Sequence, residues 1–184
     1  MTDFSKHRYV DNFSFRLRFV RSIWSFVWLV FFRPTPRGAA FARWRILLLR
    51  LFGAKIGKGC RFAPSVFVWA PWNLVVGEYS AFGDGVELYS MGMITIGSKV
   101  AVSQRSFICC GSHDISSLSR PLIVKSISIE DYAWVCAESY VGPGVTIGRG
   151  AVVAARACVS RNVDEFAVVA GNPAVFVKRR NIVE

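Results

Sequence analysis

The sequence has few acidic residues, almost no histidine and no uncharged run long enough to cross a membrane. Its 184 residues contain 12 acidic and 23 basic side chains, a formal net charge of +11, and 2 histidines. Such a charge suits nucleic acid, an anionic membrane surface or an anionic small ligand. No stretch matches a nucleic-acid-binding motif, so we expect no nucleic-acid partner.

The cysteines follow no ordered spacing. The chain has 5 of them: Cys60, Cys109, Cys110, Cys136 and Cys158. An odd number, without the spacing of a metal knuckle or a secreted disulfide framework, indicates free thiols in a reducing cytoplasm. With only His7 and His113 as histidines and no CxxC motif, we expect no metal site.

The N-terminal part is basic and rich in aromatic residues. Within residues 13–32 the uncharged stretch, residues 22–32, is 11 residues long, whereas a membrane span needs about 20. No small-residue cleavage site follows, which argues against a signal peptide. A second helix-like stretch covers residues 41–52. We predict a helical extension over residues 1–53. Its apolar faces pack on the rest of the protein or a neighbouring subunit, or lie on an anionic membrane surface, or both.

A six-residue repeat begins at Ile56. An aliphatic or aromatic residue recurs at every sixth position, usually followed by a small one, as in Ile56-Gly57, Val76-Gly77 and Ile147-Gly148. Six is a multiple of the strand period of two, so the same face always points inward. Three strand–turn units close a triangular coil of about 18 residues, and the stacked coils form a parallel β-helix.

Breaks in the repeat locate the functional region. Coils begin at Ile56, Val76, Ile96, Ile129 and Ile147, at intervals of 20, 20, 33 and 18 residues. The long interval contains an insertion, residues 114–128. Long loops that leave a rigid repeat commonly carry function. We predict an all-β parallel helix over residues 54–184, with loop 114–128 and a C-terminal tail, residues 165–184.

Four short stretches resemble a known family. They are LFGAKIG at residues 51–57, GSHD at 111–114, GPGVTIG at 142–148 and AGNPA at 170–174. The chain resembles the hexapeptide-repeat acyltransferases, most closely the colanic acid or exopolysaccharide biosynthesis O-acetyltransferases, which are related to maltose and galactoside acetyltransferases. The resemblance covers residues 51 to about 180. It implies a left-handed β-helix, a homotrimer, acetyl-CoA as co-substrate and a sugar or glycan acceptor.

His113 is the candidate catalytic residue. A lone histidine is more often structural, but this one lies at the end of a coil, directly before the insertion. Imidazole, with an ordinary pKa of about 6.5, suits proton abstraction from a hydroxyl near neutral pH. In the resembling family the histidine at this place is the general base for direct acyl transfer. Asp114 and Glu87 are candidates for substrate binding, although the family has asparagine near the latter.

The resemblance also implies a coenzyme A site. Trp134 matches a tryptophan near the thioester, and main-chain N–H groups near Ala137 and Ala155 suit the pantetheine arm and the oxyanion. The residues that match the adenosine and phosphate end are Ser160, Arg161 and Lys178. Arg156, Arg179 and Arg180 add positive charge. The alternative for these residues is an exposed tryptophan and a solvated basic tail.

Other functions remain open on the sequence alone. The same fold and base would serve N-acetylation of an amino sugar. Cys109 or Cys110 with His113 would be a nucleophilic pair, although one of the two thiols is expected to face inward. A metal-dependent hydratase needs more histidines than the chain has, and a β-helix also serves as a scaffold. We expect a cytoplasmic acetyltransferase, with contact at the inner membrane surface as one alternative.

Overall fold

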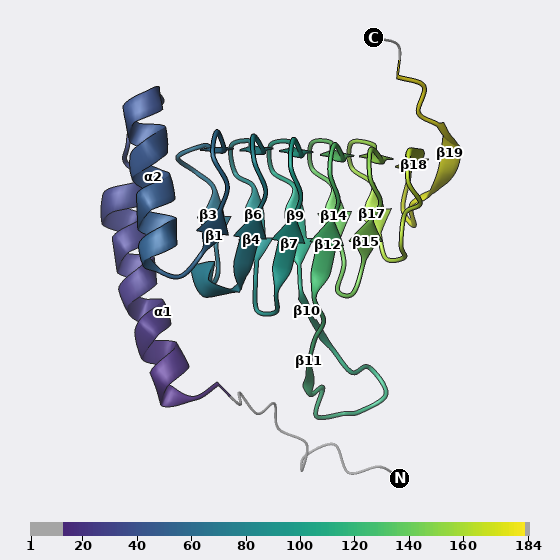
Figure 1. The fold of residues 1–184 in the computed structure, drawn as a ribbon. Coiled ribbons are helices and arrows are strands. Elements are labelled where there is room, and N and C mark those ends of the chain that lie inside the picture. The colour runs from purple at the N-terminus through teal and green to yellow at the C-terminus, as the bar shows by residue number, and fades with distance from the viewer. Residues whose placement is uncertain (1–12, 183–184) are drawn as a thin grey trace.

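The computed structural model describes residues 13–182; His7 lies outside them. Two helical segments precede a stack of strand coils (Figure 1). The first is α1 (Phe15–Val27), which continues as the π-helix η2 (Trp28–Phe32), and the second is α2 (Ala39–Leu51). The hydroxyl of Ser14 accepts a hydrogen bond from the N–H of Leu17 at 3.3 Å, which caps the start of α1.

The strands form three parallel sheets, which are the three faces of a prism. Face A contains β1 (Lys55–Ile56), β4 (Leu74–Val76), β7 (Ile94–Ile96), β12 (Ile127–Ile129) and β15 (Thr146–Ile147). Face B contains β2 (Arg61–Phe62), β5 (Ala81–Phe82), β8 (Ala101–Val102), β13 (Trp134–Val135), β16 (Val152–Val153), β18 (Ala167–Ala170) and the antiparallel β19 (Val175–Arg179). Face C contains β3 (Phe67–Val68), β6 (Glu87–Tyr89), β9 (Phe107–Cys109), β14 (Tyr140–Val141) and β17 (Cys158–Val159). The chain runs A, B, C in each coil, so the prism has an A–B edge, a B–C edge and a C–A edge.

The predicted coil starts are confirmed. All of them lie in face A at equivalent positions of successive strands, because β1, β4, β7, β12 and β15 pair in parallel and in register. Each of these side chains is buried and belongs to one continuous apolar core. The alternation of exposed and buried residues within each strand explains why a six-residue period predicts the fold.

Close stacking of the coils explains why a small residue usually follows the inward one. A Cβ atom on Gly97 would lie only 2.7 Å from the main-chain nitrogen of Asp131 in the next coil. Two positions later, the chain turns through a left-handed backbone conformation, for example at Lys99 with φ 57° and Tyr132 with φ 61°. The turn therefore requires a small residue at one position and tolerates strain at another.

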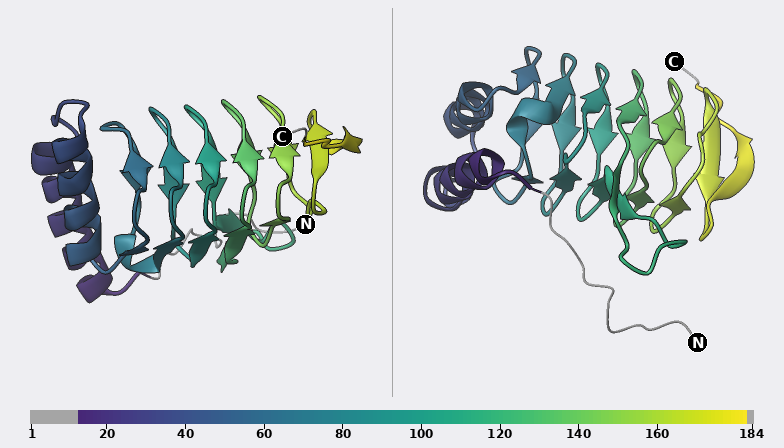
Figure 2. Two further views of the ribbon diagram at one scale, coloured as in Figure 1. Left: turned by 45° about the horizontal axis from the view of Figure 1, so that its top comes forward. Right: turned by 90° about the horizontal axis from the view of Figure 1, so that it is seen from below.

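The helices cover the N-terminal end of the prism, opposite the tail strands β18 and β19 (Figures 1 and 2). Trp24 and Leu49 are fully buried against the first coil. The indole N–H of Trp24 donates to the carbonyl oxygen of Val68 at 2.6 Å, and Nε of Arg45 donates to that of Phe62 at 2.8 Å. One side of each helix therefore packs on the β-helix. Neither described helix has the length and apolar content that a bilayer span requires.

The insertion forms a β-hairpin at the C–A edge (Figure 1). Strands β10 (Gly111–His113) and β11 (Leu122–Val124) pair antiparallel, with Gly111 opposite Val124. Residues 114–126 of the predicted insertion lie within this excursion, whereas Ile127 and Ser128 already belong to β12 of face A. The excursion also begins earlier, at Gly111, so His113 is part of the hairpin itself. The extra residues of two other coils lie at the same edge, in η3 (Pro71–Asn73) and at residues 90–93. All departures from the 18-residue coil therefore occur along one edge.

Candidate active site

His113 is exposed on the hairpin, at the end of β10. Its ring nitrogen Nδ1 lies 2.7 Å from the carbonyl oxygen of Arg120. A carbonyl oxygen can only accept a hydrogen bond, so Nδ1 carries the proton in this contact. In the neutral ring the lone pair is then on Nε2. The main chain of the hairpin thus selects the tautomer in which Nε2 can accept a proton.

Asp114 does not provide this orienting contact. Its carboxylate accepts hydrogen bonds from the N–H and hydroxyl of Ser116, at 2.8 and 2.5 Å. These bonds, led by the one from the hydroxyl, lower the pKa of Asp114. The structure therefore places Asp114 in a local turn that shapes the hairpin loop.

Tyr89, rather than Glu87, stands at the base of the hairpin. A Cβ atom on Gly111 would lie 2.8 Å from the sulfur of Met91 and 3.6 Å from the Tyr89 ring. Glu87 is at the other end of β6, exposed on face C, and pairs in register with Phe107. Tyr89 and Met91 were not predicted as site residues; the extra residues near 91 were the signal that could have found them.

An aromatic row on face C connects the helices to the hairpin base. The rings of Trp69 and Tyr89 lie 5.8 Å apart, as do those of Tyr89 and Phe107 and those of Phe107 and Tyr140. At one end of the row the guanidinium of Arg21 lies over Trp69, 3.8 Å from the ring centroid. No sequence pattern predicts this row, because its members come from separate coils.

Arg21 lines a hollow beside α1. The hollow has a volume of about 440 Å³ and is lined by Phe13, Leu17, Arg18, Arg21, Ser22 and Ser25. Burial lowers the pKa of Arg21. Within the part of the chain that the structure describes, its Nε is a buried donor without a hydrogen-bond partner. Such a donor marks a place where an anionic group would be stabilised.

The residues predicted for coenzyme A divide between two regions of the prism. Trp134 is 45% exposed on face B, and its indole N–H donates to the hydroxyl of Ser103 at 3.0 Å. Lys178 is on the same face in β19, opposite Val168. Ala137 and Ala155 lie in turns at the neighbouring B–C edge.

Ser160 and Arg161 lie elsewhere, exposed in the turn after β17 at the C–A edge. This is the edge that carries His113. The coil of β17 is two coils beyond that of β9, which corresponds to about 10 Å along the prism.

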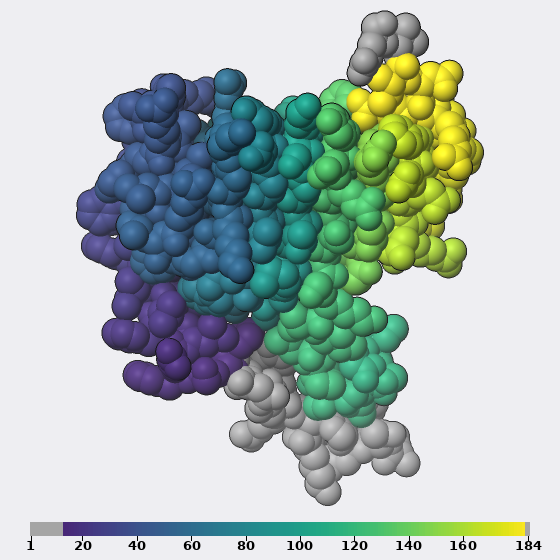
Figure 3. All heavy atoms as spheres, viewed as in Figure 1, coloured from purple at the N-terminus to yellow at the C-terminus, as the bar shows by residue number. Residues whose placement is uncertain are grey.

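The topology keeps His113 and Trp134 of one chain apart. In a triangular prism the C–A edge is opposite face B, and the hairpin projects outward from that edge (Figures 1 and 3). Within one chain the folded core lies between the two residues. A pocket formed by both therefore needs two chains.

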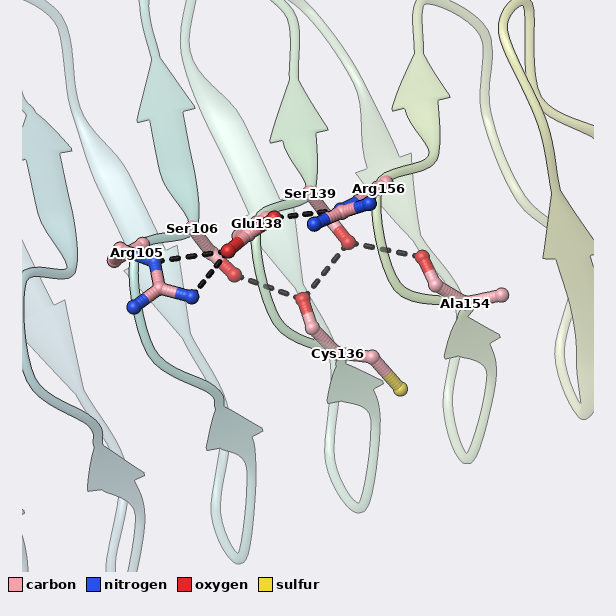
Figure 4. A network of polar contacts seen from close by, with 7 residues as sticks. All are labelled: Arg105, Ser106, Cys136, Glu138, Ser139, Ala154 and Arg156. Carbon is pink, nitrogen blue, oxygen red and sulfur yellow. Dashed lines mark hydrogen bonds and ion pairs between the residues drawn. The ribbon is translucent and has the colours of Figure 1, made fainter.

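Charges on the B–C edge are partly compensated. Glu138 accepts hydrogen bonds from Arg105 and from Nε of Arg156, the latter at 2.7 Å (Figure 4). These contacts, led by Arg156, lower the pKa of Glu138. Beneath the network, buried serine hydroxyls donate hydrogen bonds to main-chain carbonyl oxygens. Ser106 donates to that of Cys136, and Ser139 to those of Cys136 and Ala154.

The last two arginines of the tail hold it to the prism. A guanidinium nitrogen of Arg180 donates to the carbonyl oxygens of Tyr132 and Gly150, at 3.1 and 3.0 Å. Arg179 donates to the carbonyl oxygen of Glu165 at 3.2 Å. Lys178 and Arg161 are exposed.

The cysteines beside the hairpin are poor nucleophiles. Cys110 is completely buried, and burial raises the pKa of its thiol to about 11. The Cys109 thiol is also buried and donates to the carbonyl oxygen of Gly111 at 3.2 Å. A thiol that burial keeps protonated, as it does that of Cys110, is a poor nucleophile for a thioester. Among residues 13–182, no three metal-ligating side chains are grouped so that they could hold an ion.

Comparison with known proteins relates the chain to acetyltransferases. It is 43% identical over 158 residues to the colanic acid biosynthesis acetyltransferase WcaF of Escherichia coli strain K12, covering 86% of each chain. The hexapeptide-repeat acetyltransferase VCA0836 of Vibrio cholerae, complexed with acetyl coenzyme A, has a TM-score of 0.81 at 24% identity, covering 97% of this chain and 98% of that one. Galactoside acetyltransferase in complex with coenzyme A has a TM-score of 0.83 at 19% identity, covering 93% and 86%.

No family model matches the chain. The structural neighbours are left-handed β-helices, and the fold of this chain is accordingly a left-handed parallel β-helix, as the resemblance implied.

Proposed function

Since the chain belongs to the family of hexapeptide-repeat acetyltransferases that includes WcaF, we propose that it transfers acetyl from acetyl-CoA to a hydroxyl of a sugar or glycan precursor, with His113 as general base. The observation that carries this proposal is the hydrogen bond from Nδ1 of His113 to the carbonyl oxygen of Arg120. It gives the neutral imidazole the tautomer that a base at Nε2 requires.

The proposed reaction is a direct transfer. Nε2 of His113 removes the proton from the acceptor hydroxyl as its oxygen attacks the thioester carbonyl. The tetrahedral intermediate then collapses, the carbon–sulfur bond breaks, and the imidazolium returns the proton to the leaving thiolate. The products are the acetyl ester and free coenzyme A. The buried, protonated thiol of Cys110 argues against an acyl-enzyme at this position.

Coenzyme A would bind along the prism, at the surface of face B and the B–C edge. The turns at Ala137 and Ala155 have small side chains, so the pantetheine arm can approach their main-chain N–H groups. Trp134 is exposed next to these turns and would cover the thioester end. At the other end, Lys178 on face B would bind phosphate. Ser160 and Arg161 lie at the C–A edge with His113, so they would reach the same coenzyme A only from the neighbouring chain.

The enzyme would act as a homotrimer with its sites between chains. His113 and face B point in different directions in one chain, so the hairpin of one protomer would complete the site on its neighbour. The hairpin also carries apolar side chains that one chain leaves in solvent: Ile115 is 97% exposed and Leu118 43%. Apolar groups of this kind are typical of a surface that a partner covers.

The acceptor would lie on face C next to the hairpin. The half-buried Tyr89 at the hairpin base offers a ring to a pyranose, with the buried Trp69 behind it, and Glu87 offers a hydrogen-bond acceptor farther along the face. Arg21 at the end of the row would suit an anionic substituent of the acceptor. The same arrangement would admit an amino sugar, so N-acetylation is the second product to test.

The test is acetyl transfer from acetyl-CoA to a panel of sugars, amino sugars and lipid-linked sugars, followed by identification of the product bond. Mild alkali or hydroxylamine releases acetyl from an ester but not from an amide. We expect an alkali-labile product whose formation matches the release of free thiol. An alkali-stable product would establish N-acetylation, and thiol release with no acceptor acetylated would contradict the proposal.

A further inference from the structure

The helical end of the molecule carries a large apolar surface that the fold leaves uncovered. Each helix packs one side on the first coil and exposes apolar side chains on the other. We call these side chains the end face: Phe15, Phe19, Ile23, Phe26, Leu29, Val30 and Phe31 from α1 and η2, and Phe41, Trp44, Leu47 and Leu51 from α2. Phe15 is 83% exposed and Leu51 70%. Exposed apolar surface of this extent marks a binding surface.

The two helices form one layer, so the end face is continuous. The indole N–H of Trp44 in α2 donates to the carbonyl oxygen of Phe31 in η2 at 2.9 Å. The ring of Phe31 contacts that of Phe26 on the preceding helix, at a centroid separation of 6.4 Å. The layer lies across the end of the prism and faces away from the coils (Figures 1 and 2).

The charged side chains of the described helical segments, residues 15–51, are all basic. The sequence has no acidic residue between Asp11 and Glu78. Arg16 and Arg43 are exposed on the same helices, and Arg33 is exposed directly after η2. Arg50 is also exposed, but its guanidinium donates to the carbonyl oxygen of Ile56 at 2.5 Å. Aromatic side chains with arginine and no carboxylate are the composition of helices that lie in the interface of an anionic bilayer.

We propose that the end face binds the surface of an anionic lipid bilayer, with both helices parallel to the membrane plane. A second copy of this chain fits less well, because pairing two end faces would bring arginines against arginines, and the described helices carry no carboxylate to pair with them. An anionic bilayer supplies both an apolar layer for Phe15, Phe19 and Phe26 and negative charge for the arginines. This inference does not depend on the proposed reaction.

The position of the end face on the prism also determines how an assembled enzyme would meet the membrane. The end face points along the prism axis, whereas the His113 hairpin projects from its side (Figure 1). In a trimer whose prisms are parallel, three end faces would lie on one side of the assembly and bind one membrane together. The aromatic row of face C begins next to α1, so an acceptor held in that membrane would reach the hairpin base along it.

The experiment is co-flotation of the full-length protein with vesicles of phosphatidylcholine, with and without phosphatidylglycerol. We expect the wild type to float only with the anionic vesicles, and high salt to reduce binding. Phe15→Ser/Phe19→Ser/Phe26→Ser is expected to weaken binding about a hundredfold, and Arg16→Gln/Arg43→Gln by about fivefold for each arginine. The matched control, Val175→Ser/Phe176→Ser, removes exposed apolar side chains from the tail instead and should float like the wild type.

A measurement on Trp44 covers the case in which the triple variant does not fold. Brominated lipids quench indoles that enter the acyl region, so they should quench wild-type fluorescence more than that of Trp44→Phe. The proposal is overturned if neither vesicle type binds the wild type, or if the folded triple variant binds as well as the wild type. It is also overturned if the end face instead joins two copies, seen as a larger assembly without lipid that the triple variant abolishes.

Discussion

Nδ1 of His113 donates a hydrogen bond to the carbonyl oxygen of Arg120, at 2.7 Å, across the turn of the hairpin. The group that orients Nδ1 is therefore a main-chain oxygen. Asp114, adjacent in sequence, is engaged by Ser116 instead. A neutral acceptor at Nδ1 fixes the tautomer and the ring orientation of His113.

The first prediction concerns the side chain of Arg120. Because its main-chain oxygen makes the contact, Arg120→Gly should preserve the hydrogen bond. The residue has φ 46°, a conformation that glycine adopts without strain. We expect kcat to change by less than about threefold, well below the effect of losing a general base. A loss in Arg120→Gly as large as that in His113→Ala would show that the side chain, not the main chain, is required.

The second prediction concerns Cys110. Burial raises the pKa of this thiol to about 11, from an ordinary value of 9.0. Because the folded pKa exceeds the unfolded one, the contribution to stability is complete below pH 9 and is lost as the pH rises through about 11. Urea unfolding should show the wild type losing about 1–2 kcal/mol more over this range than Cys110→Ala.

Cys110→Ala also tests the mechanism. The variant should keep its activity near neutral pH, because the proposed transfer uses no thiol nucleophile. Loss of turnover in a variant that remains folded and trimeric would favour a covalent intermediate on sulfur. A pH dependence of stability equal to that of the wild type would show that the thiol is not held protonated by burial.

The third prediction concerns the hairpin tip. Ile115 is almost fully exposed in one chain, and we expect a neighbouring chain to cover it. Ile115→Asp should weaken the trimer by about 2 kcal/mol, or roughly thirtyfold in the dissociation constant. Sedimentation velocity over a range of concentrations measures this. Val175→Asp, at an exposed site in the tail, is the control. An active wild-type monomer would contradict the interface.

The fourth prediction is complementation between two inactive chains. His113→Ala removes the base. Ala155→Trp blocks the opposite side of the site, the B–C edge, where the pantetheine arm would pass. If each site takes its base from one chain and its B–C edge from the next, mixed trimers refolded from equal amounts should regain about a quarter of wild-type activity. If mixed trimers form but remain inactive, each site is formed by a single chain.

The sequence predicted the coils more reliably than the site, for a physical reason. The inward positions at Ile56, Val76 and Ile96 depend only on local alternation of apolar and exposed residues, which a six-residue period shows directly. The hairpin depends on a non-local pairing, Gly111 with Val124, and no period predicts it. The insertion indicated a departure from the coil but not where the departure begins.

Site residues that come from separate coils were also hard to predict. Tyr89 is beside Gly111 only because successive coils stack, and Arg21 reaches Trp69 only because α1 packs against the first coil. The orienting oxygen of Arg120 belongs to the main chain, and its residue type carries no signal. By contrast, His113 was predicted because a histidine next to an interruption of the repeat is visible in the sequence.

The most direct test of the account is the rate of thiol release from acetyl-CoA, with a sugar acceptor, by wild type and His113→Ala. Size-exclusion chromatography and thermal melting first establish that the variant is folded and assembled like the wild type. If Nε2 of His113 is the base, the variant should lose a factor of about 10²–10⁴ in kcat while binding acetyl-CoA with similar affinity. Turnover equal to that of the wild type would contradict the mechanism.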